Sequence, residues 1–357
     1  MERIELKLES LSPVHISDWK TLSKFEYIID GDKVRVIDFT KLMEKLDIGK
    51  IKSLERISEE YANVGRFNNE EALRELGINL NDIPIAREIK HRNLEGYLEI
   101  RQFVRMCDGV DCSYIPGSSI KGSIRTSWAF DYLTRERERL IQEIRRNKKR
   151  AWNNLNQTIF GRTPHEDVFR NVSVSDSNLI KDEELEIYVA KRYNLVRGVF
   201  QVPQCLECIR AGSKIDGITI SSYESSRDGI DLHKIFQKTN EFHEKIVDFE
   251  LSQNRIPEKL RNFYENLKEE FNSLREGEEM IIRIGFGTQF HSKTLWTLIN
   301  EMSDRLSIGD VRWMIHKRAR PRVRQFRDYP TTRLIVEMDG IYYPLGWVKL
   351  TKKESEE

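Results

Sequence analysis

The chain opens with apolar and charged residues in strict alternation. Ile4, Leu6 and Leu8 would lie on one face of an extended segment with charged residues on the other, the pattern of a half-buried strand over 3–8. A similar stretch over 25–30 is joined to one over 33–39 by the turn sequence Asp-Gly-Asp, which predicts a β-hairpin. The amino-terminal part of the chain is therefore predicted to form antiparallel strands.

Helical spacing follows this hairpin. Over 39–77 apolar residues recur every three to four positions, which is the spacing of one helix face. A helix is predicted over 118–133, and a highly charged one continues to about residue 159. The stretch 232–276 predicts a helical hairpin interrupted at Pro257, because proline lacks the donor that a helix interior needs.

Short strands are predicted in the rest of the chain. They are FRNVSVSDSNL, LEIYVAKRYNLV, FQVPQCLECIRAGSKI, ITISSYE, MIIRI, RLIVEM and the final stretch from Trp347 to Leu350. This mixture contains no regular βαβ array and no solenoid-like repeat, so it favours an α+β fold with antiparallel sheets. A chain of 357 residues is long for one core and suits two domains, which we place at 1–165 and 166–357.

Composition narrows the class of protein. Hydrophobic residues make up 39% and charged residues 33%, and no apolar stretch approaches the roughly 20 residues of a membrane-spanning helix. The amino terminus lacks the basic and apolar blocks of a signal peptide, so we expect a cytoplasmic protein without membrane contact.

The formal net charge of +1 hides two basic segments. The first contains Lys121, Arg125, Arg135, Arg137, Arg139, Arg145, Arg146, Lys148, Lys149 and Arg150, and the second Arg312, Lys317, Arg318, Arg320, Arg322, Arg324 and Arg327. Each could be only a solvated face. The aromatic residues Trp313 and Phe326 within the second segment favour nucleic acid, where bases stack and phosphates pair with cations.

The segment YIPGSSIKGSIRTSWAFDYL carries the most chemistry. Ile120, Ile124 and Trp128 are spaced to seat a helix on a sheet, and serines stand at its start. Lys121 and Arg125 lie four residues apart on a neighbouring face. Serines, a small residue and two cations near free backbone N–H groups predict a phosphate site, although an ordinary capped amphipathic helix would look the same.

Five segments together resemble a known family. IPGSSIKGSIRT resembles the first-helix motif of the repeat-associated mysterious protein (RAMP) superfamily, and SPVHI, FRNVSVSDS, GFGTQFHSKT and TTRLIVEMDGIYYPLGWVKL agree with it in the expected order. The set most resembles the subunit of type III-A CRISPR Csm complexes that follows the repeated backbone subunits toward the 3′ end of the guide RNA.

The resemblance implies two modified ferredoxin-like (RRM/RAMP-type) domains with helical insertions. It implies a non-catalytic subunit, without metal or cofactor, that binds crRNA, caps the filament and aids crRNA maturation and antiviral defence. The implied partners are crRNA, target RNA, the backbone RAMP subunits of the Csm complex and a host trimming nuclease. The expected RNA-binding residues are Gly117, Ser118, Ser119, Lys121, Arg125, Arg170, Gly285, Gly287, Thr288, Gln289, His291 and Lys293.

Several alternatives stay open. GFGTQF lacks the third glycine of a dinucleotide-binding motif but could be a plain tight turn. Arg170 could simply pair with Asp176. His15 follows the first strand, where some RAMP nucleases place catalytic groups, so a metal-independent endoribonuclease that processes crRNA is one rival function. An assembly factor that recruits a trimming nuclease is another.

The cysteines pose a separate question. Cys205 and Cys208, with Cys107 and Cys112, could supply four thiolates for zinc. Positions three apart on a strand point to opposite faces, which argues against such a site and leaves no metal expected.

Overall fold

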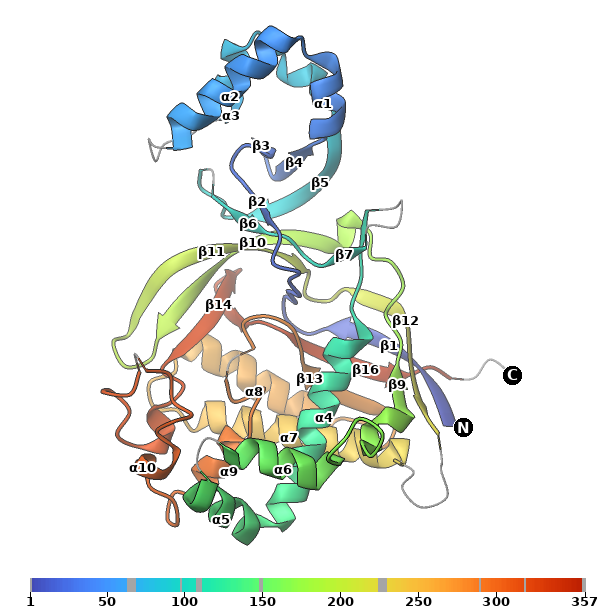
Figure 1. Ribbon diagram of the computed structural model, residues 1–357, viewed down its shortest axis with the longest axis vertical. Coiled ribbons are helices and arrows are strands. Elements are labelled where there is room, and N and C mark those ends of the chain that lie inside the picture. The colour runs from blue at the N-terminus through green and yellow to red at the C-terminus, as the bar shows by residue number, and fades with distance from the viewer. Residues whose placement is uncertain are drawn as a thin grey trace.

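A computed structural model describes residues 2–62, 69–96, 98–106, 111–147, 150–223, 230–288, 290–317 and 319–354. Figure 1 shows β10 and β11 of one sheet above another sheet that contains β1 and β16, with α4, α7 and α8 below. The helices α1 to α3 form a separate group at the top of the view, and both termini lie at the right.

The first sheet has the strand order β13-β16-β1-β12-β9 and is antiparallel throughout. Its strands are β1 (Glu2–Ser10), β9 (Val172–Val174), β12 (Lys214–Ser222), β13 (Glu279–Arg283) and β16 (Trp347–Lys352). The order β16-β1-β12-β9 places the first strand of the chain at the centre, as in a ferredoxin-like sheet, and β13 extends the edge. This confirms the predicted α+β class.

The second sheet runs β2-β6-β11-β10-β5-β4-β3, and β14 pairs with both β10 and β15. Its strands are β2 (Thr21–Leu22), β3 (Tyr27–Asp30), β4 (Lys33–Ile37), β5 (Ile85–Arg92), β6 (Ile100–Arg101), β10 (Leu185–Asn194), β11 (Val199–Ile209), β14 (Thr332–Met338) and β15 (Ile341–Pro344). The pairs β5–β10 and β6–β11 are parallel, which the predicted antiparallel pattern did not include. A two-stranded piece joins β7 (Arg105–Met106) to β8 (Cys112–Ser113).

The segments predicted as helical contain helices, but the charged stretch up to residue 159 forms two of them and the short helix over 308–311 was not predicted. The helices are α1 (Phe39–Lys45), α2 (Ile48–Ala62), α3 (Asn69–Glu75), α4 (Gly117–Arg135), α5 (Arg137–Asn147), α6 (Ala151–Phe160), α7 (Leu232–Leu251), α8 (Glu258–Asn272), α9 (Trp296–Glu301) and α10 (Ile308–Val311). Single 3-10 turns are η1 (Leu80–Asp82), η3 (Val168–Asn171), η4 (Asp182–Glu184) and η5 (Phe326–Asp328). Pro257 is the N-cap of α8, so it separates α7 from α8 as predicted.

Strand pairing crosses the expected domain boundary. β1 pairs with β12 on one side and β16 on the other, through Leu6 opposite Ile218 and Leu8 opposite Leu350. Both segments, 1–165 and 166–357, therefore contribute strands to the first sheet. The division into two units stays a prediction.

Candidate nucleic-acid interface

A cleft of about 400 Å³ lies at the start of α4, and we call it the helix cleft. Three segments far apart in the sequence line it: 16–19 after β1, 118–126 of α4, and 283–293 after β13. These segments belong to three of the motifs that carry the family resemblance. The fold thus brings them to one place.

The start of α4 forms one wall of the helix cleft. Ser118 and Ser119, in the first turn, line the cleft close to the positive end of the helix dipole. A Cβ added to Gly122 would meet nothing within 4 Å, so the backbone is open to the cleft there. Hydroxyl groups and accessible backbone at a helix start suit a phosphate.

Gly117 has a different role. Its N–H donates to Asp176 Oδ1 at 2.8 Å, and a Cβ at this position would lie 2.3 Å from the carbonyl oxygen of Val174. The glycine is therefore required by the close contact of α4 with the end of β9. It does not line the helix cleft.

Lys121 and Arg125 lie on a neighbouring face of α4, outside the cleft lining. The Arg125 guanidinium pairs with Asp167 at 2.8 Å and stacks on the Phe160 ring, 3.6 Å from its centroid. These contacts already satisfy Arg125 within the protein. Burial lowers the pKa of Lys121, and Asp167 lies close enough to oppose that shift.

The glycine-rich turn is explained by backbone conformation and packing. Gly285 has φ +84°, and a Cβ there would lie 2.3 Å from the carbonyl oxygen of His15. Gly287 has φ +76° and lies against Leu334 and Leu345, whose methyl groups would be 2.8 Å from an added Cβ. Both glycines therefore fit the tight-turn alternative, and Gly285 also lines the helix cleft.

Arg283, at the end of β13, brings a positive charge to the helix cleft. It is 2% exposed, and Nε donates to the Leu345 carbonyl at 2.9 Å while Nη1 donates to Ser292 Oγ at 3.4 Å. Nη2 is buried without a hydrogen-bond partner among the described residues, and the guanidinium lies 5.3 Å from the centroid of the Trp347 ring. Lys293 lines the same cleft. Its pKa is lowered mainly by desolvation and, to a smaller extent, by the positive charge of Arg283. Two cations that repel each other on one wall would gain from an anion between them.

Two other predicted residues of this region do not line the cleft. The His291 ring is fully buried, with Nε2 2.8 Å from Glu250 Oε1, and burial lowers its pKa to about 4. Thr288 is buried and donates to the Gly285 carbonyl at 3.1 Å. In this conformation neither side chain is exposed to a ligand, because both are used in packing. Gln289 lies outside the described residues.

Arg170 is exposed on η3 and its guanidinium donates to the carbonyl of His165. It therefore makes a local contact, but with a different partner from the predicted Asp176. Arg170 does not line the helix cleft. In the second basic segment, Phe326 is 5% exposed and its ring lies 5.8 Å from that of Trp296, so it is not available to stack on a base.

Among the cleft residues that were not predicted as site residues, Arg283 and Trp19 matter most for RNA. Arg283 lies within the apolar strand MIIRI. A single arginine in an otherwise apolar strand is the sequence signal that could have indicated a buried functional charge, because arginine is rarely buried without a reason. Trp19 follows the SPVHI motif and is 81% exposed at the cleft edge. An aromatic residue among polar ones in a loop would have indicated it.

The alternative catalytic and zinc sites find no support in their local geometry. His15 is fully buried between the sheets, where Nδ1 lies 2.7 Å from the Glu207 carbonyl and burial lowers its pKa. Cys205 and Cys208 both lie buried on β11, in different hydrophobic clusters, and Cys107 lies outside the described residues. Among the described residues no group of three or more potential ligands could hold a metal ion.

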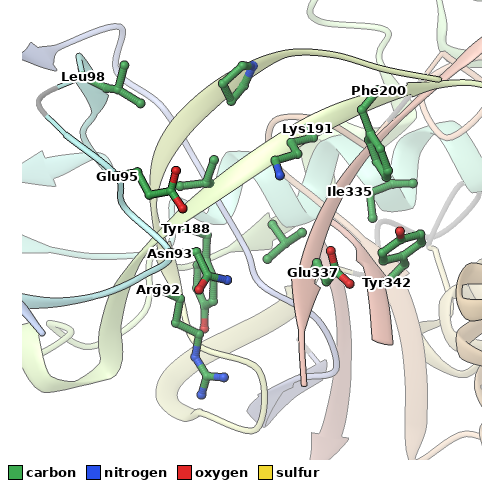
Figure 2. A pocket seen from close by; sticks show the side chains of 13 residues that line it. Arg92, Asn93, Glu95, Leu98, Tyr188, Lys191, Phe200, Ile335, Glu337 and Tyr342 are labelled. Atoms are coloured by element: carbon green, nitrogen blue, oxygen red, sulfur yellow. The ribbon is translucent and has the colours of Figure 1, made fainter. Parts of the chain in front are cut away.

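Another hollow, of about 320 Å³, lies on the second sheet over β10, β11 and β14 (Figure 2). Phe200, Ile335 and Tyr342 gather on one side of it, away from Asn93 and Glu95. Two of its charged groups are paired, since Arg92 contacts Glu186 at 2.9 Å and Glu337 contacts Lys259 at 3.1 Å. Lys191 and Glu95 also line it, and none of the family motifs except the closing one contributes to its lining.

No helix in the described part of the chain is long and apolar enough to cross a membrane.

Comparisons with known proteins agree with the resemblance. The chain is 25% identical over 384 residues to the CRISPR system Cms protein Csm5 of Methanocaldococcus jannaschii, covering 98% of this chain and 89% of that protein. It is 21% identical to the Csm5 of Mycobacterium tuberculosis strain H37Rv, covering 100% and 99% of the two chains.

Solved structures share the fold. A chain of a Csm–crRNA–target RNA ternary complex from a type III-A CRISPR-Cas system matches with a TM-score of 0.74 at 20% identity, over 98% of this chain and 100% of that one. Csm5 of T. onnurineus matches with a TM-score of 0.67 at 18% identity, over 96% and 99%. The RAMP superfamily model matches residues 108–290. Because that match spans more than half of the sequence, the chain belongs to the RAMP superfamily.

Proposed function

We propose that this chain is a subunit of a type III-A CRISPR complex and that it binds crRNA without cleaving it. In this role it occupies the end of the backbone filament toward the crRNA 3′ end, contacts a backbone RAMP subunit and acts in the cytoplasm. The full-length similarity to proteins named Csm5 supports membership of such a complex. Its contribution to crRNA maturation would be to fix the 3′ end where a trimming nuclease acts.

The observation that carries RNA binding is the composition of the helix cleft. It joins the start of α4 to Lys293 and to the positive charge of the buried Arg283. Such groups bind phosphate through their positive charge and through backbone N–H groups at the helix start. They do not contact base edges, so binding should not depend on the RNA sequence.

We propose that the protein is not a ribonuclease because of where His15 lies. A metal-independent ribonuclease needs a base and an acid that reach the RNA together. The His15 ring is 0% exposed and is covered by Phe103 and Phe286 at ring distances of 6.3 and 5.7 Å. A side chain in this position does not reach a ribose hydroxyl.

The test is binding and cleavage of end-labelled single-stranded RNA by the purified full chain, with and without divalent metal, over a salt series. We expect intact RNA and an affinity that falls linearly with salt on logarithmic axes. Lys293→Ala should weaken binding and reduce the slope by about 0.7, the contribution of one phosphate contact to a single strand.

Lys52→Ala is the matched control, because Lys52 is an exposed lysine on α2, which lies far from α4 in Figure 1, and it does not line the helix cleft. It should leave affinity and slope unchanged. Defined cleavage products that disappear in His15→Ala would make the protein an endoribonuclease. Salt-insensitive or absent RNA binding, with normal docking onto the backbone subunits, would make it an assembly factor.

A further inference from the structure

Trp19 is the most exposed large hydrophobic side chain of the described residues, with 81% of its surface accessible. It lines the helix cleft and also a neighbouring hollow of about 510 Å³, which we call the strand cleft. Ser17 is the other residue common to both. The indole therefore stands on the ridge between two hollows.

The backbone at Trp19 is unusual. Its φ is +71°, a left-handed conformation that is rare and strained for a bulky residue. The Trp19 N–H donates to Ser17 Oγ at 3.0 Å, and the Lys20 N–H donates to Asp18 Oδ1 at 3.0 Å. These side-chain contacts hold a turn that presents the ring to solvent. Strain kept by specific contacts, at a residue with no core to fill, indicates a functional position.

The strand cleft continues the positive character of the helix cleft. Lys24 and Arg101 line it, together with one acid, Glu99. The Arg101 guanidinium lies 5.0 Å from the centroid of the Phe286 ring, and Phe286 lines the helix cleft. The Trp19 loop and this cation–π pair thus connect the linings of the two clefts. Cations stand on both sides of the loop.

We propose that a single strand of RNA crosses this ridge from the helix cleft to the strand cleft, with one base stacked on the Trp19 indole. This rests on the proposed function and extends it from phosphate contacts to a stacking residue and a path. An aromatic ring between two positively charged hollows matches how proteins hold single strands without sequence preference. Every base offers a π-face, so the stacked nucleotide need not be a particular one.

The test compares Trp19→Ala and Trp19→Phe with wild type in anisotropy measurements on two probes, a single-stranded RNA and an abasic ribose-phosphate oligomer of the same length. We expect Trp19→Ala to weaken binding of the RNA by about 5- to 150-fold, the usual loss for one stacked base. It should leave the abasic oligomer and the salt slope unchanged, because the indole contacts no phosphate. Trp19→Phe should recover most of the affinity.

Tyr223→Ala is the matched control, since Tyr223 is an aromatic residue 52% exposed and lines neither cleft. If Trp19→Ala binds RNA as Tyr223→Ala does, the stacking proposal is wrong while RNA binding stands. An equal loss on the abasic oligomer would also overturn it, because Trp19 would then only shape the clefts. Intact RNA binding with lost co-assembly would assign the indole to a protein partner. Failure of the wild type to bind either probe would instead refute the proposed function itself.

Discussion

A buried carboxylate, Glu250 on α7, holds the loop that forms one wall of the helix cleft. Its Oε2 accepts from Arg333 Nε of β14 at 2.8 Å, and Oε1 lies 2.8 Å from His291 Nε2. All three side chains are at most 1% exposed. Arg333 lowers the pKa of Glu250 to about 2 against the opposing effect of burial, so the carboxylate is charged at neutral pH. The contact ties a helix, a strand and the segment 283–293 together.

We predict that Glu250→Gln lowers the free energy of unfolding by about 3–5 kcal/mol, because it leaves the buried guanidinium of Arg333 without its anionic partner. That is a large part of the roughly 5–15 kcal/mol that stabilises a typical domain. Urea unfolding followed by tryptophan fluorescence measures it. The cleft should loosen too, so RNA affinity should fall although Glu250 contacts no ligand.

Glu244→Gln is the control, with the same chemical change on the same helix. Glu244 is 39% exposed at its side chain and pairs with Lys268 at 2.7 Å, an ion pair worth about 0–1 kcal/mol because water screens it. If the two variants unfold at the same urea concentration, the reasoning about the buried charge is wrong.

Two further predictions concern histidine and glycine. His243 and His291 are fully buried, and desolvation lowers the pKa of each to about 4. In the unfolded chain both histidines bind a proton below about pH 6.5, whereas in the folded protein they stay neutral. The free energy of unfolding should therefore fall from pH 7.5 to pH 5 by on the order of 2 kcal/mol per histidine. Equal urea midpoints at these two pH values would contradict this. Gly285→Ala should lower the free energy of unfolding by more than about 2 kcal/mol, because the added methyl group meets the His15 carbonyl in addition to the strain of a left-handed backbone. Gly340, at φ +80°, has open space around it, so Gly340→Ala should show only the backbone strain of about 1–2 kcal/mol. Thermal unfolding of both variants compares the two losses, and equal losses would mean that the close approach at Gly285 relaxes without cost.

The sequence by itself determined the local elements of this protein. Alternation over 3–8 marks β1, and the four-residue spacing of Ile120 and Ile124 marks the buried face of α4. Pro257 divides α7 from α8 because it lacks an N–H. Such signals depend only on near neighbours in the chain, so they can be read without knowing the fold. The strands that were missed include β5, although its burial alternates, and the short β6, which carries too few residues for a periodic signal.

The family motifs also located the segments of the helix cleft. They did not separate residues that face the cleft from residues that support it. Ser118, Ser119, Gly285 and Lys293 line the cleft, whereas Arg125 is engaged with Asp167.

Only the tertiary structure decided that distinction. β1 pairs with strands more than two hundred residues away, which places the loop after β1 beside α4 and beside the turn after β13. The same pairing buries His15, exposes Trp19 and directs Arg283 to the cleft. Burial and the meeting of distant side chains depend on long-range packing, which local periodicity does not encode.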